Sequence, residues 1–522
     1  MQSSLEDKMK ASANDTVPPQ AQLNNLLEHY QNRRLGNAEE LALSITQQYP
    51  EHAFSWKILG AIFGQTGRKS EAINADQRAL QLAPQDPEAH NNLGITLKIL
   101  GRLDDASGCF WKAIGIKPDY VEAHYNLGNT LQEQGKLEEA EASYRKAIAL
   151  KHDLSEAYSS LGNTLNTSNR FKEAEVMLSQ AIAFKPNYAE AHSNLGNTLQ
   201  GLGRLDEAQA SYTKAIALKP DLAKTHYNLG ITLQELGRLD EAQASYIQAI
   251  ALKPDFTDVF WNLHGIQRTI QGAEHWIDKC LIADTNHVKA RLIKAALRFY
   301  QGDKSDYNDL LQSKFKEHPY IRSFSWALNL PNLPELHFER SYFFDAIVKK
   351  SIISRPFYEF GVFRGAAFKY LIKSFKKGYG FDTFTGLPED WIVPEDWIVG
   401  THTEKAGSYS NDGVVPTIKG GEFIVGKFED TLPVFFSDSR PMASLINFDA
   451  DLYSSTICAL NFSKSVIDKD TILIFDELIM NESWEQDEFK ALNEFCSLNH
   501  CSYEVMAISF FTKQVAVKLI GI

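Results

Sequence analysis

A period of 34 residues runs through the first half of the chain and constrains its fold more than any other feature. Glycine keeps this step at Gly60, Gly94, Gly128, Gly162, Gly196 and Gly230, and alanine keeps it at Ala72, Ala106, Ala140, Ala174, Ala208 and Ala242. Proline follows at Pro50, Pro84, Pro118, Pro186, Pro220 and Pro254, with His152 in the remaining place. Small residues let two helices cross closely, and proline ends a helix. The period therefore predicts stacked helix pairs, each burying its apolar face against its neighbours.

A unit such as "AHYNLGNTLQEQGKLEEAEASYRKAIAL" has the length of one helix-turn-helix and resembles the tetratricopeptide repeat (TPR) family. The resemblance implies an α-solenoid (a TPR superhelix) with a concave groove over residues 19–300. Within it we expect a worn unit over 19–52, six regular units over 53–256 and a degenerate helical cap over 257–300. Residues 1–18 carry no such pattern and are expected to be disordered.

Asparagine stands two residues before the recurring glycine in most units, and Ser160 is the exception. These amides are Asn92, Asn126, Asn194, Asn228 and Asn262. An amide both donates and accepts, so a row of them pairs with an extended backbone whatever its side chains are. The row resembles the asparagine ladder of the nucleocytoplasmic O-linked N-acetylglucosamine transferase and predicts a groove for a protein or peptide. The alternative is a solvated polar helix face copied by duplication.

The overall charge and the cysteines restrict the partners and the compartment. The chain has 53 Lys plus Arg against 66 Asp plus Glu, a net charge of −13 that repels phosphate backbones, so nucleic acid is not expected as a partner. No apolar leader and no run of 18 apolar residues is present, so neither secretion nor a membrane span is expected. The five scattered cysteines form no CxxC pair, which suits reduced thiols and a cytoplasmic location.

The period ends near residue 300, and the pattern of the second half is different. Residues 301–339 are interpreted as a connector, and residues 340–522 alternate short strand-like and helical runs. The runs are "PFYEFGVF", "GYGFDTF", "EFIVGKF", "ASLINFDADL" and "TILIFDEL". Such alternation predicts an α/β domain with a doubly wound, mostly parallel sheet. The final runs "YEVMAIS" and "QVAVKLIGI" predict an antiparallel hairpin at one edge of that sheet.

Acidic residues follow the predicted strands where ligands of such sheets bind, beyond the carboxyl ends. The first strand ends at Glu359 and leads into Gly361 and Gly365, which let the backbone approach a ligand. The second ends at Asp382, 23 residues after Glu359, where an acid would accept both hydroxyls of a ribose. Glu359 and Phe360 stand where a dinucleotide would need its phosphate cradle, which favours S-adenosylmethionine over NAD.

Five blocks of the second half carry a family resemblance. They are "FYEFGVFRGAAF", "GFDTFTGLPEDW", "IVGKFEDTLP", "FDADLYSST" and "ILIFDEL". In this order they resemble the macrocin O-methyltransferase family, S-adenosylmethionine-dependent enzymes of the Rossmann-like class I fold, and the resemblance covers residues 340–522. It implies that Glu359 and Gly361 lie by the methionine moiety and that Asp382 takes the ribose. It also implies adenine contacts at Gly426, Phe428 and Asp430, and a divalent metal such as Mg²⁺ at Asp449, Asp476 and Glu477.

This resemblance implies methyl transfer to a hydroxyl of a sugar or similar acceptor. Carboxylate oxygens are the ligands that Mg²⁺ prefers, and a bound metal lowers the pKa of a hydroxyl and orients it. Asp449 or Asp451 would then take the proton, and His402 is a further candidate base in the loop after the second strand. That loop is lengthened by a repeated "PEDWIV" at 388–393 and 394–399.

Two alternatives remain. Asp449-Ala-Asp451 is also a DxD motif, of the kind that binds a metal and a nucleotide sugar, so the chain would be a TPR-guided glycosyltransferase. The other alternative is a TPR scaffold whose methyltransferase-like domain is inactive.

Overall fold

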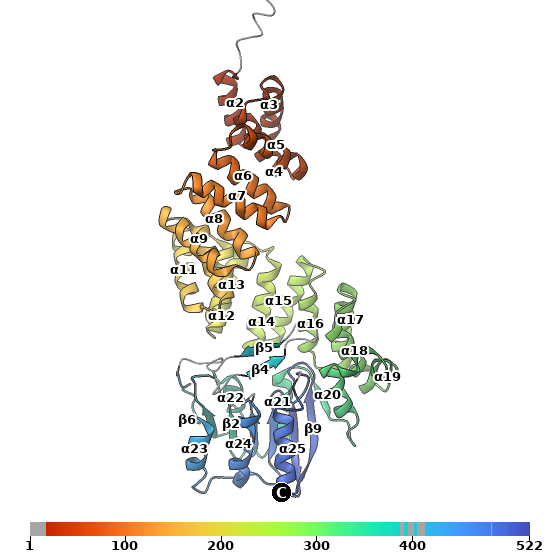
Figure 1. Ribbon diagram of the computed structural model, residues 1–522. Helices are drawn as coiled ribbons and strands as arrows, with labels where there is room; N and C mark the ends of the chain where they lie inside the picture. Colours follow the sequence, from red (N-terminus) through yellow and green to blue (C-terminus); the bar gives the residue numbers. More distant parts are fainter. Residues whose placement is uncertain (1–16, 387–390, 395–400, 405–412, 451, 482) are drawn as a thin grey trace, which may run out of the picture. The chain divides into compact units, whose positions relative to one another are not determined.

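Antiparallel helix pairs follow one another through the first half of the computed structural model (Figure 1). The structure describes residues 17–386, 391–394, 401–404, 413–450, 452–481 and 483–522. The disorder expected for residues 1–18 falls, apart from the last two residues, outside this range. The described residues form two units, one ending at Thr232 and the other spanning Leu233–Ile522.

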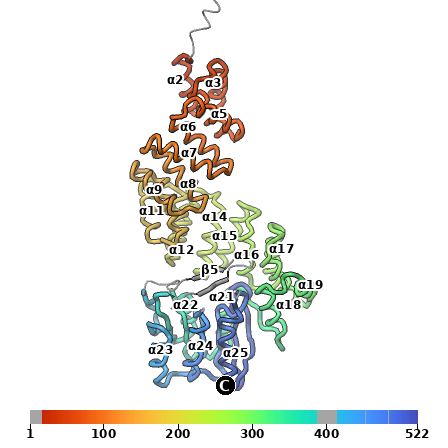
Figure 2. The backbone as a smooth tube through the Cα atoms, viewed as in Figure 1, coloured from red at the N-terminus to blue at the C-terminus, as the bar shows by residue number. Residues whose placement is uncertain are grey.

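The first unit consists of the predicted repeats, and the tube in Figure 2 shows them as successive pairs. Its helices are α2 (Gln20–Gln31), α3 (Leu35–Gln48), α4 (Ala53–Gln65), α5 (Lys69–Leu82), α6 (Pro87–Ile99), α7 (Leu103–Ile116), α8 (Val121–Glu133), α9 (Leu137–Leu150), α10 (Ser155–Thr167), α11 (Phe171–Phe184), α12 (Ala189–Gly201) and α13 (Leu205–Leu218); α14 (Ala223–Glu235) runs across the boundary. The turns within pairs use a left-handed glycine, as at Gly101 and Gly135, where φ is +75°.

The recurring glycine of each first helix receives a large side chain from the second helix. A Cβ on Gly94 would lie 2.7 Å from the Phe110 ring, and one on Gly128 would lie 2.6 Å from the Tyr144 ring. Both rings are fully buried, and the Tyr144 hydroxyl lies 2.8 Å from both Asn129 Oδ1 and Gln132 Oε1, so it donates its one hydrogen to either oxygen. The 34-residue step is therefore a repeated packing of one small residue against one large residue.

The first regular unit departs from this packing because Asp76 stands where the other units place a large apolar or aromatic side chain. Asp76 is 2% exposed and faces Gly60. Its Oδ2 accepts a hydrogen bond from Thr96 Oγ1 at 2.6 Å, whereas Oδ1 has no partner among the described residues. Burial raises the pKa of this carboxyl to about 7.

Replacing this carboxylate should therefore stabilise the first repeats. Asp76→Leu matches the Leu178 that faces Gly162 and should add about 1–2 kcal/mol to the free energy of unfolding at pH 8. The raised pKa means that wild-type stability falls as pH rises from 3.8 through about 7, so the gain should shrink at pH 5. Hydrogen exchange of residues 53–83 at both pH values measures this gain in stability. The control is Asp206→Leu at an exposed position, which should show no pH-dependent gain.

The second unit begins with helices that continue the repeat pattern and the predicted helical cap. They are α15 (Leu239–Leu252), α16 (Thr257–Gly265), α17 (Ile270–Ala283) and α18 (Val288–Tyr300), followed in the predicted connector by α19 (Ser305–Leu311), η1 (Lys314–Glu317) and α20 (Pro319–Leu328). This helical part contacts the segment between β8 (Ile472–Phe475) and α25 (Glu488–Leu498): Arg322 pairs with Glu485 at 2.7 Å, and the Met480 N–H donates to Ser323 Oγ at 2.8 Å.

An eight-stranded mixed sheet forms the rest of the unit, in the order β1-β9-β10-β8-β7-β2-β3-β6. Its strands are β1 (Glu335–His337), β2 (Phe357–Phe360), β3 (Gly378–Asp382), β6 (Gly421–Val425), β7 (Leu445–Phe448), β8 (Ile472–Phe475), β9 (Ser502–Ser509) and β10 (Val515–Ile520). The five predicted strands are confirmed as β2, β3, β6, β7 and β8, all parallel. If these five strands are numbered 1 to 5 in chain order, their order across the sheet, read from β6 to β8, is 3-2-1-4-5.

The predicted terminal hairpin is confirmed as β9–β10, but its expected place at the edge is wrong. Strand β1, which comes from the predicted connector, pairs in parallel with β9 and covers it, and β10 lies between β8 and β9. A free strand edge exposes unpaired backbone groups, so this short strand shields the hairpin.

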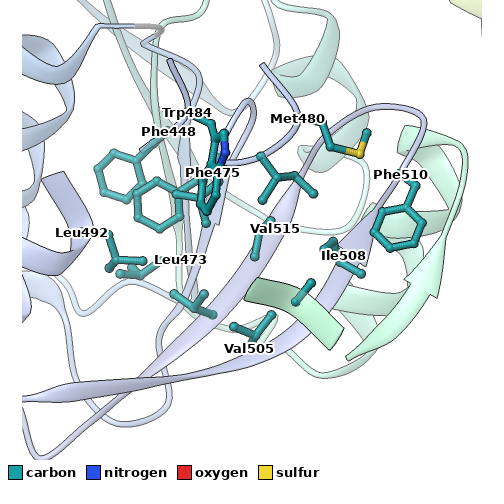
Figure 3. Packing of buried hydrophobic residues seen from close by; sticks show 14 of the residues in the cluster. Phe448, Leu473, Phe475, Met480, Trp484, Leu492, Val505, Ile508, Phe510 and Val515 are labelled. Carbon is teal, nitrogen blue, oxygen red and sulfur yellow. The ribbon is translucent and has the colours of Figure 1, made fainter. Parts of the chain in front are cut away.

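Each face of the sheet is covered by its own helices. On one face the ring centroids of the strand residues Phe360 and Phe448 lie 5.4 Å apart. Those of Phe448 and Phe475, both labelled in Figure 3, lie 4.9 Å apart. Helices α23 (Phe428–Phe435), α24 (Tyr453–Ser463) and α25 (Glu488–Leu498) cover this face. Helices α21 (Arg340–Lys349) and α22 (Ala366–Leu371) cover the other face. Because side chains alternate along a strand, Glu359 points to the side of α21 and α22.

The turn between β9 and β10 inserts an aromatic side chain against the helical cap. A Cβ on Gly265, the last residue of α16, would lie 2.5 Å from the Phe511 ring. The neighbouring His264 is fully buried with its ring centroid 5.2 Å from Phe511, and burial lowers its pKa to about 3, so it is neutral. The cap and the sheet therefore share one packed interface.

Gly265→Ala should destabilise the second unit by about 1–3 kcal/mol, because the added methyl group overlaps the Phe511 ring in a filled space. Thermal denaturation with Phe511→Ala added should restore part of the loss. As a control, Gly108→Ala in α7 meets open space and should raise stability by about 0.5–1 kcal/mol. Equal effects of the two alanine substitutions would contradict the packing at Gly265.

Candidate functional site

The candidate site lies at the carboxyl ends of β2 and β7. These strands are neighbours in the sheet, with Glu359 opposite Asn447 and Phe360 opposite Phe448. The chain order reverses between them, since β3 and β6 extend to one side of β2 and β8 extends to the other side of β7. In doubly wound sheets this reversal opens a crevice where ligands bind.

Gly361 lets the ends of β2 and β7 approach each other. Its φ is +88°, and a Cβ there would lie 1.7 Å from the backbone oxygen of Asp449. The backbone also connects the strands, because the Asp449 N–H donates to Phe360 O at 2.8 Å. A side chain at 361 is therefore excluded. Gly365, with φ of +73°, begins α22 beyond this loop.

Asp382 holds the loop that follows β2. Its Oδ2 accepts from the backbone N–H groups of Val362 at 2.8 Å and Phe363 at 2.7 Å. Its Oδ1 accepts from the Phe384 N–H at 2.6 Å. Sequence reasoning missed this loop-shaping role. A carboxylate offers about four lone-pair positions, so the predicted ribose contact stays a prediction.

Two buried polar side chains at this edge have unpaired atoms. Glu359 is 1% exposed and its Oε2 has no partner among the described residues. The neighbouring Asn447 is fully buried, and neither its Oδ1 nor its Nδ2 has a partner there. Burial raises the pKa of Glu359 well above its ordinary value of 4.5, and the nearby Arg340 only partly opposes this. Such unpaired buried groups are costly, so a polar group bound at this edge of the sheet would gain by pairing with them.

Arg340 was not predicted as a site residue, yet it lies among the acids. Its Nη2 donates to both oxygens of Asp476, at 3.0 and 2.9 Å. Its charge also interacts with Asp449 and Glu359, and the Asp476 carboxylate raises the pKa of the guanidinium. Arg340 precedes β2 and opens α21, so no strand-end signal could have identified it.

Two of the three acids predicted to hold a metal, Asp476 and Glu477, have protein partners. Asp476 also accepts from Gln514 Nε2 at 2.7 Å, and Glu477 Oε1 lies 3.1 Å from Lys513 Nζ. Within the residues that the structure describes, no group of three or more His, Cys, Asp or Glu side chains is arranged to hold a metal ion. As arranged, Asp476 and Glu477 fit cationic and amide donors rather than Mg²⁺.

The predicted adenine-contacting residues are only partly brought to the edge. The Gly426 N–H donates to the Asp382 backbone oxygen at 3.0 Å, and its φ is +141°. The Phe428 ring lies 5.6 Å from the Phe360 ring, near the end of β2. Asp430 is exposed in the first turn of α23.

Two predicted bases lie wholly or partly outside the described residues. Asp451 lies outside the described residues. The backbone of His402 belongs to β5 (Thr401–Glu404), where it pairs with Val393 of β4 (Trp391–Pro394) in a separate two-stranded sheet. Its side chain is outside what the structure describes, so its role stays a prediction.

The predicted asparagine ladder is half-buried and makes hydrogen bonds between or within repeats. The donors and acceptors are Asn126 Nδ2 to Asn91 Oδ1 at 3.0 Å, Asn194 Nδ2 to Ser159 Oγ at 3.4 Å, Asn228 Nδ2 to Asn197 Oδ1 at 2.8 Å and Asn262 Nδ2 to the Tyr246 hydroxyl at 3.4 Å; Asn92 is also half-buried. These amides therefore help to join successive helices, and a role in binding peptide stays a prediction.

Comparison with known families confirms the repeats. Tetratricopeptide repeat models match residues 23–87, 77–106, 121–154 and 187–255, and a TPR repeat model matches 96–135 and 162–203. No curated protein matches the chain. Among the described helices, none combines the length and the apolar character that a bilayer span requires.

Several solved structures are similar over the repeats. YrrB, a TPR protein with an unusual peptide-binding site, is 24% identical, covers 37% of this chain and 98% of its own, and has a TM-score of 0.31. TTC0263, a thermophilic TPR protein of Thermus thermophilus, is 28% identical, covers 34% and 96%, and has a TM-score of 0.31. PilF of Pseudomonas aeruginosa is 19% identical, covers 39% and 92%, and has a TM-score of 0.36.

The buried carboxyl of Glu359 predicts a pH-dependent stability. Because its folded-state pKa is raised, the folded protein retains a proton that the unfolded chain releases above pH 4.5, so stability falls as pH rises from there. Glu359→Gln removes this loss and should raise the Tm at pH 8, with little difference at pH 4.5. The exposed Glu504→Gln on β9 is the control and should not alter the pH profile. A Tm that Glu359→Gln lowers equally at both pH values would contradict the assignment.

Proposed function

We propose that residues 340–522 bind S-adenosylmethionine and transfer its methyl group to a hydroxyl of a sugar or similar acceptor, in the cytoplasm. The observation that carries the proposal is the placement of unpaired, buried Glu359 and Asn447 beside the glycine loop at the strand-order reversal. Ligands of doubly wound sheets bind there, and the unpaired oxygen of Glu359 suits the ammonium group of a methionine moiety.

The loop after β2 supports a donor without phosphates. In dinucleotide sites, backbone N–H groups of this loop point at the pyrophosphate. Here the N–H groups of Val362 and Phe363 donate to Asp382 instead, which already supplies the negative charge. A bound phosphate would find these N–H donors already occupied and would be repelled by the Asp382 carboxylate. This favours S-adenosylmethionine over NAD.

The remaining residues have assigned roles under this proposal. Gly361 keeps the floor of the crevice open, Asp382 offers a free lone pair to a ribose hydroxyl, and Phe428 offers an aromatic ring to adenine. In the reaction the sulfonium–methyl bond breaks, the acceptor oxygen bonds the methyl carbon, and the hydroxyl proton passes to the Asp449 carboxylate. The products are the methyl ether and S-adenosylhomocysteine.

The repeats supply the second part of the proposed function. TPR arrays are suited to protein interaction, and a stacked array presents an extended surface to a partner. We assign to this array the binding of a protein or peptide, which either carries the acceptor hydroxyl or holds the enzyme in an assembly.

The proposal is tested by calorimetry with S-adenosylmethionine. The wild type should bind, and Asp382→Ala should weaken binding at least about 100-fold, because hydrogen bonds to a charged group contribute about 1.5–3 kcal/mol each. The control is Asp468→Ala, which removes a carboxylate of the same kind at the other end of the sheet. Asp468 accepts from the Asp470 and Thr471 N–H groups at 3.0 and 3.1 Å and pairs with Arg355.

Asp468→Ala should lose stability and keep its affinity for the cofactor. Heat with a UDP-sugar and none with S-adenosylmethionine would favour the glycosyltransferase alternative instead. Heat with neither compound would leave a TPR scaffold with an inactive domain.

A further inference from the structure

Cationic side chains of the protein, Arg340 and Lys513, already pair with acids at the carboxyl edge of the sheet. Arg340 Nη2 faces both oxygens of Asp476, and Gln514 Nε2 donates to one of them. Lys513 pairs with Glu477, the third acid of the set expected from the sequence. Two of the three carboxylates that would form a divalent-metal site, Asp476 and Glu477, are therefore paired with protein donors, and the third, Asp449, lies within the electrostatic reach of Arg340.

Arg340 is held in this place by the helix that it begins. Glu339 caps α21 by accepting a hydrogen bond from the Ser341 N–H at 2.6 Å. Phe343 and Phe344 are buried in the core between α21 and the sheet, and this packing fixes the first turn of α21 near the strand ends. Tyr342 lies under the Arg268 guanidinium of the helical cap, with 4.4 Å between Arg268 Cζ and the ring centroid. The backbone that carries Arg340 is therefore held rigidly.

A divalent ion and Arg340 compete for the same oxygens. Mg²⁺ requires about six oxygen ligands at roughly 2.0–2.1 Å in near-octahedral geometry. An ion bound to Asp476 at that distance would lie beside the guanidinium, and two like charges at close range in a partly buried site repel strongly. One of the two must leave. Arg340 is covalently held and needs no binding step, so the exchange favours the side chain.

We propose that Arg340 takes the place of the divalent cation: it is the permanent positive group of this edge, and the site holds its donor and acceptor without a metal. The inference deepens the proposed function and rests on it for the identity of the ligand. Acceptors that bind by chelating a metal through two hydroxyls are then not required. The guanidinium can also contact a bound ligand, because its side chain is 36% exposed and its hydrogen bonds to Asp476 are both made by Nη2.

Manganese binding tests the exchange directly, on the full chain stripped with chelator, by the EPR signal of free Mn²⁺. In the wild type, Mn²⁺ should not bind at Asp476, so Asp476→Asn should leave the Mn²⁺ titration unchanged. Arg340→Met, which keeps the length of the side chain but not its charge, should bind Mn²⁺ at Asp476 at least about tenfold more tightly than any residual binding there in the wild type, since removing about 1.4 kcal/mol of repulsion corresponds to tenfold. Adding Asp476→Asn to Arg340→Met should remove this site again.

Arg355→Met is the matched control. Arg355 Nη1 donates to both oxygens of Asp468 at 2.9 and 2.8 Å, so this variant breaks an equivalent pair at the opposite end of the sheet and should gain no Mn²⁺ site. A wild-type Mn²⁺ site that Asp476→Asn abolishes would overturn the proposal, and this measurement holds even if Arg340→Met fails to fold. A folded Arg340→Met without a new site would overturn it as well.

Cofactor binding separates this inference from the proposed function. Calorimetry of the wild type with S-adenosylmethionine should give the same affinity with chelator as with added Mg²⁺. A requirement for Mg²⁺ would overturn the role of Arg340. Absence of S-adenosylmethionine binding in both conditions would instead overturn the proposed function, while the Mn²⁺ result would still decide which cation the acids hold.

Discussion

The close approach of β2 and β7 is the constraint on which the candidate site depends. The backbone oxygen of Asp449 fills the space that any side chain at position 361 would need, so the two strand ends meet with only backbone between them. This contact fixes which residues share the crevice. Glu359 and Asn447 come side by side beneath it, and Asp382 secures the loop above it through three backbone N–H groups. Polar groups that would be costly in an ordinary core are thus gathered at one point.

Electrostatics decides what these gathered acids can do. Four carboxylates interact with the charge of one guanidinium, and the most buried of them, Glu359, is pushed toward its neutral form. The negative charge at this edge of the sheet is therefore already partly neutralised by the protein. Its charge is balanced by side chains from α21 and from the β9–β10 turn, elements that are distant from one another in the sequence.

The sequence was most informative where one local rule repeats. The 34-residue step reflects a glycine packed against a large apolar or aromatic side chain in the units after the first, and the five parallel strands reflect buried apolar runs. Non-local partners could not be predicted. Arg340 lies in a helix ahead of β2, and Phe511 meets Gly265 although nearly half of the chain separates them. Strand β1 is only three residues long and gains its stability from pairing with β9, so its apolar pattern is too short to detect.

Strand β1 and the Phe511 turn also bear on how this protein can be divided. A fragment cut where the sequence pattern changes, at residue 340, would lose the strand that covers β9 and the helix that receives Phe511. An uncovered strand edge next to an exposed aromatic ring promotes intermolecular β-pairing and aggregation. The sheet is therefore not an independent module, and its recombination with other repeat arrays in evolution would have to carry residues 257–339 along.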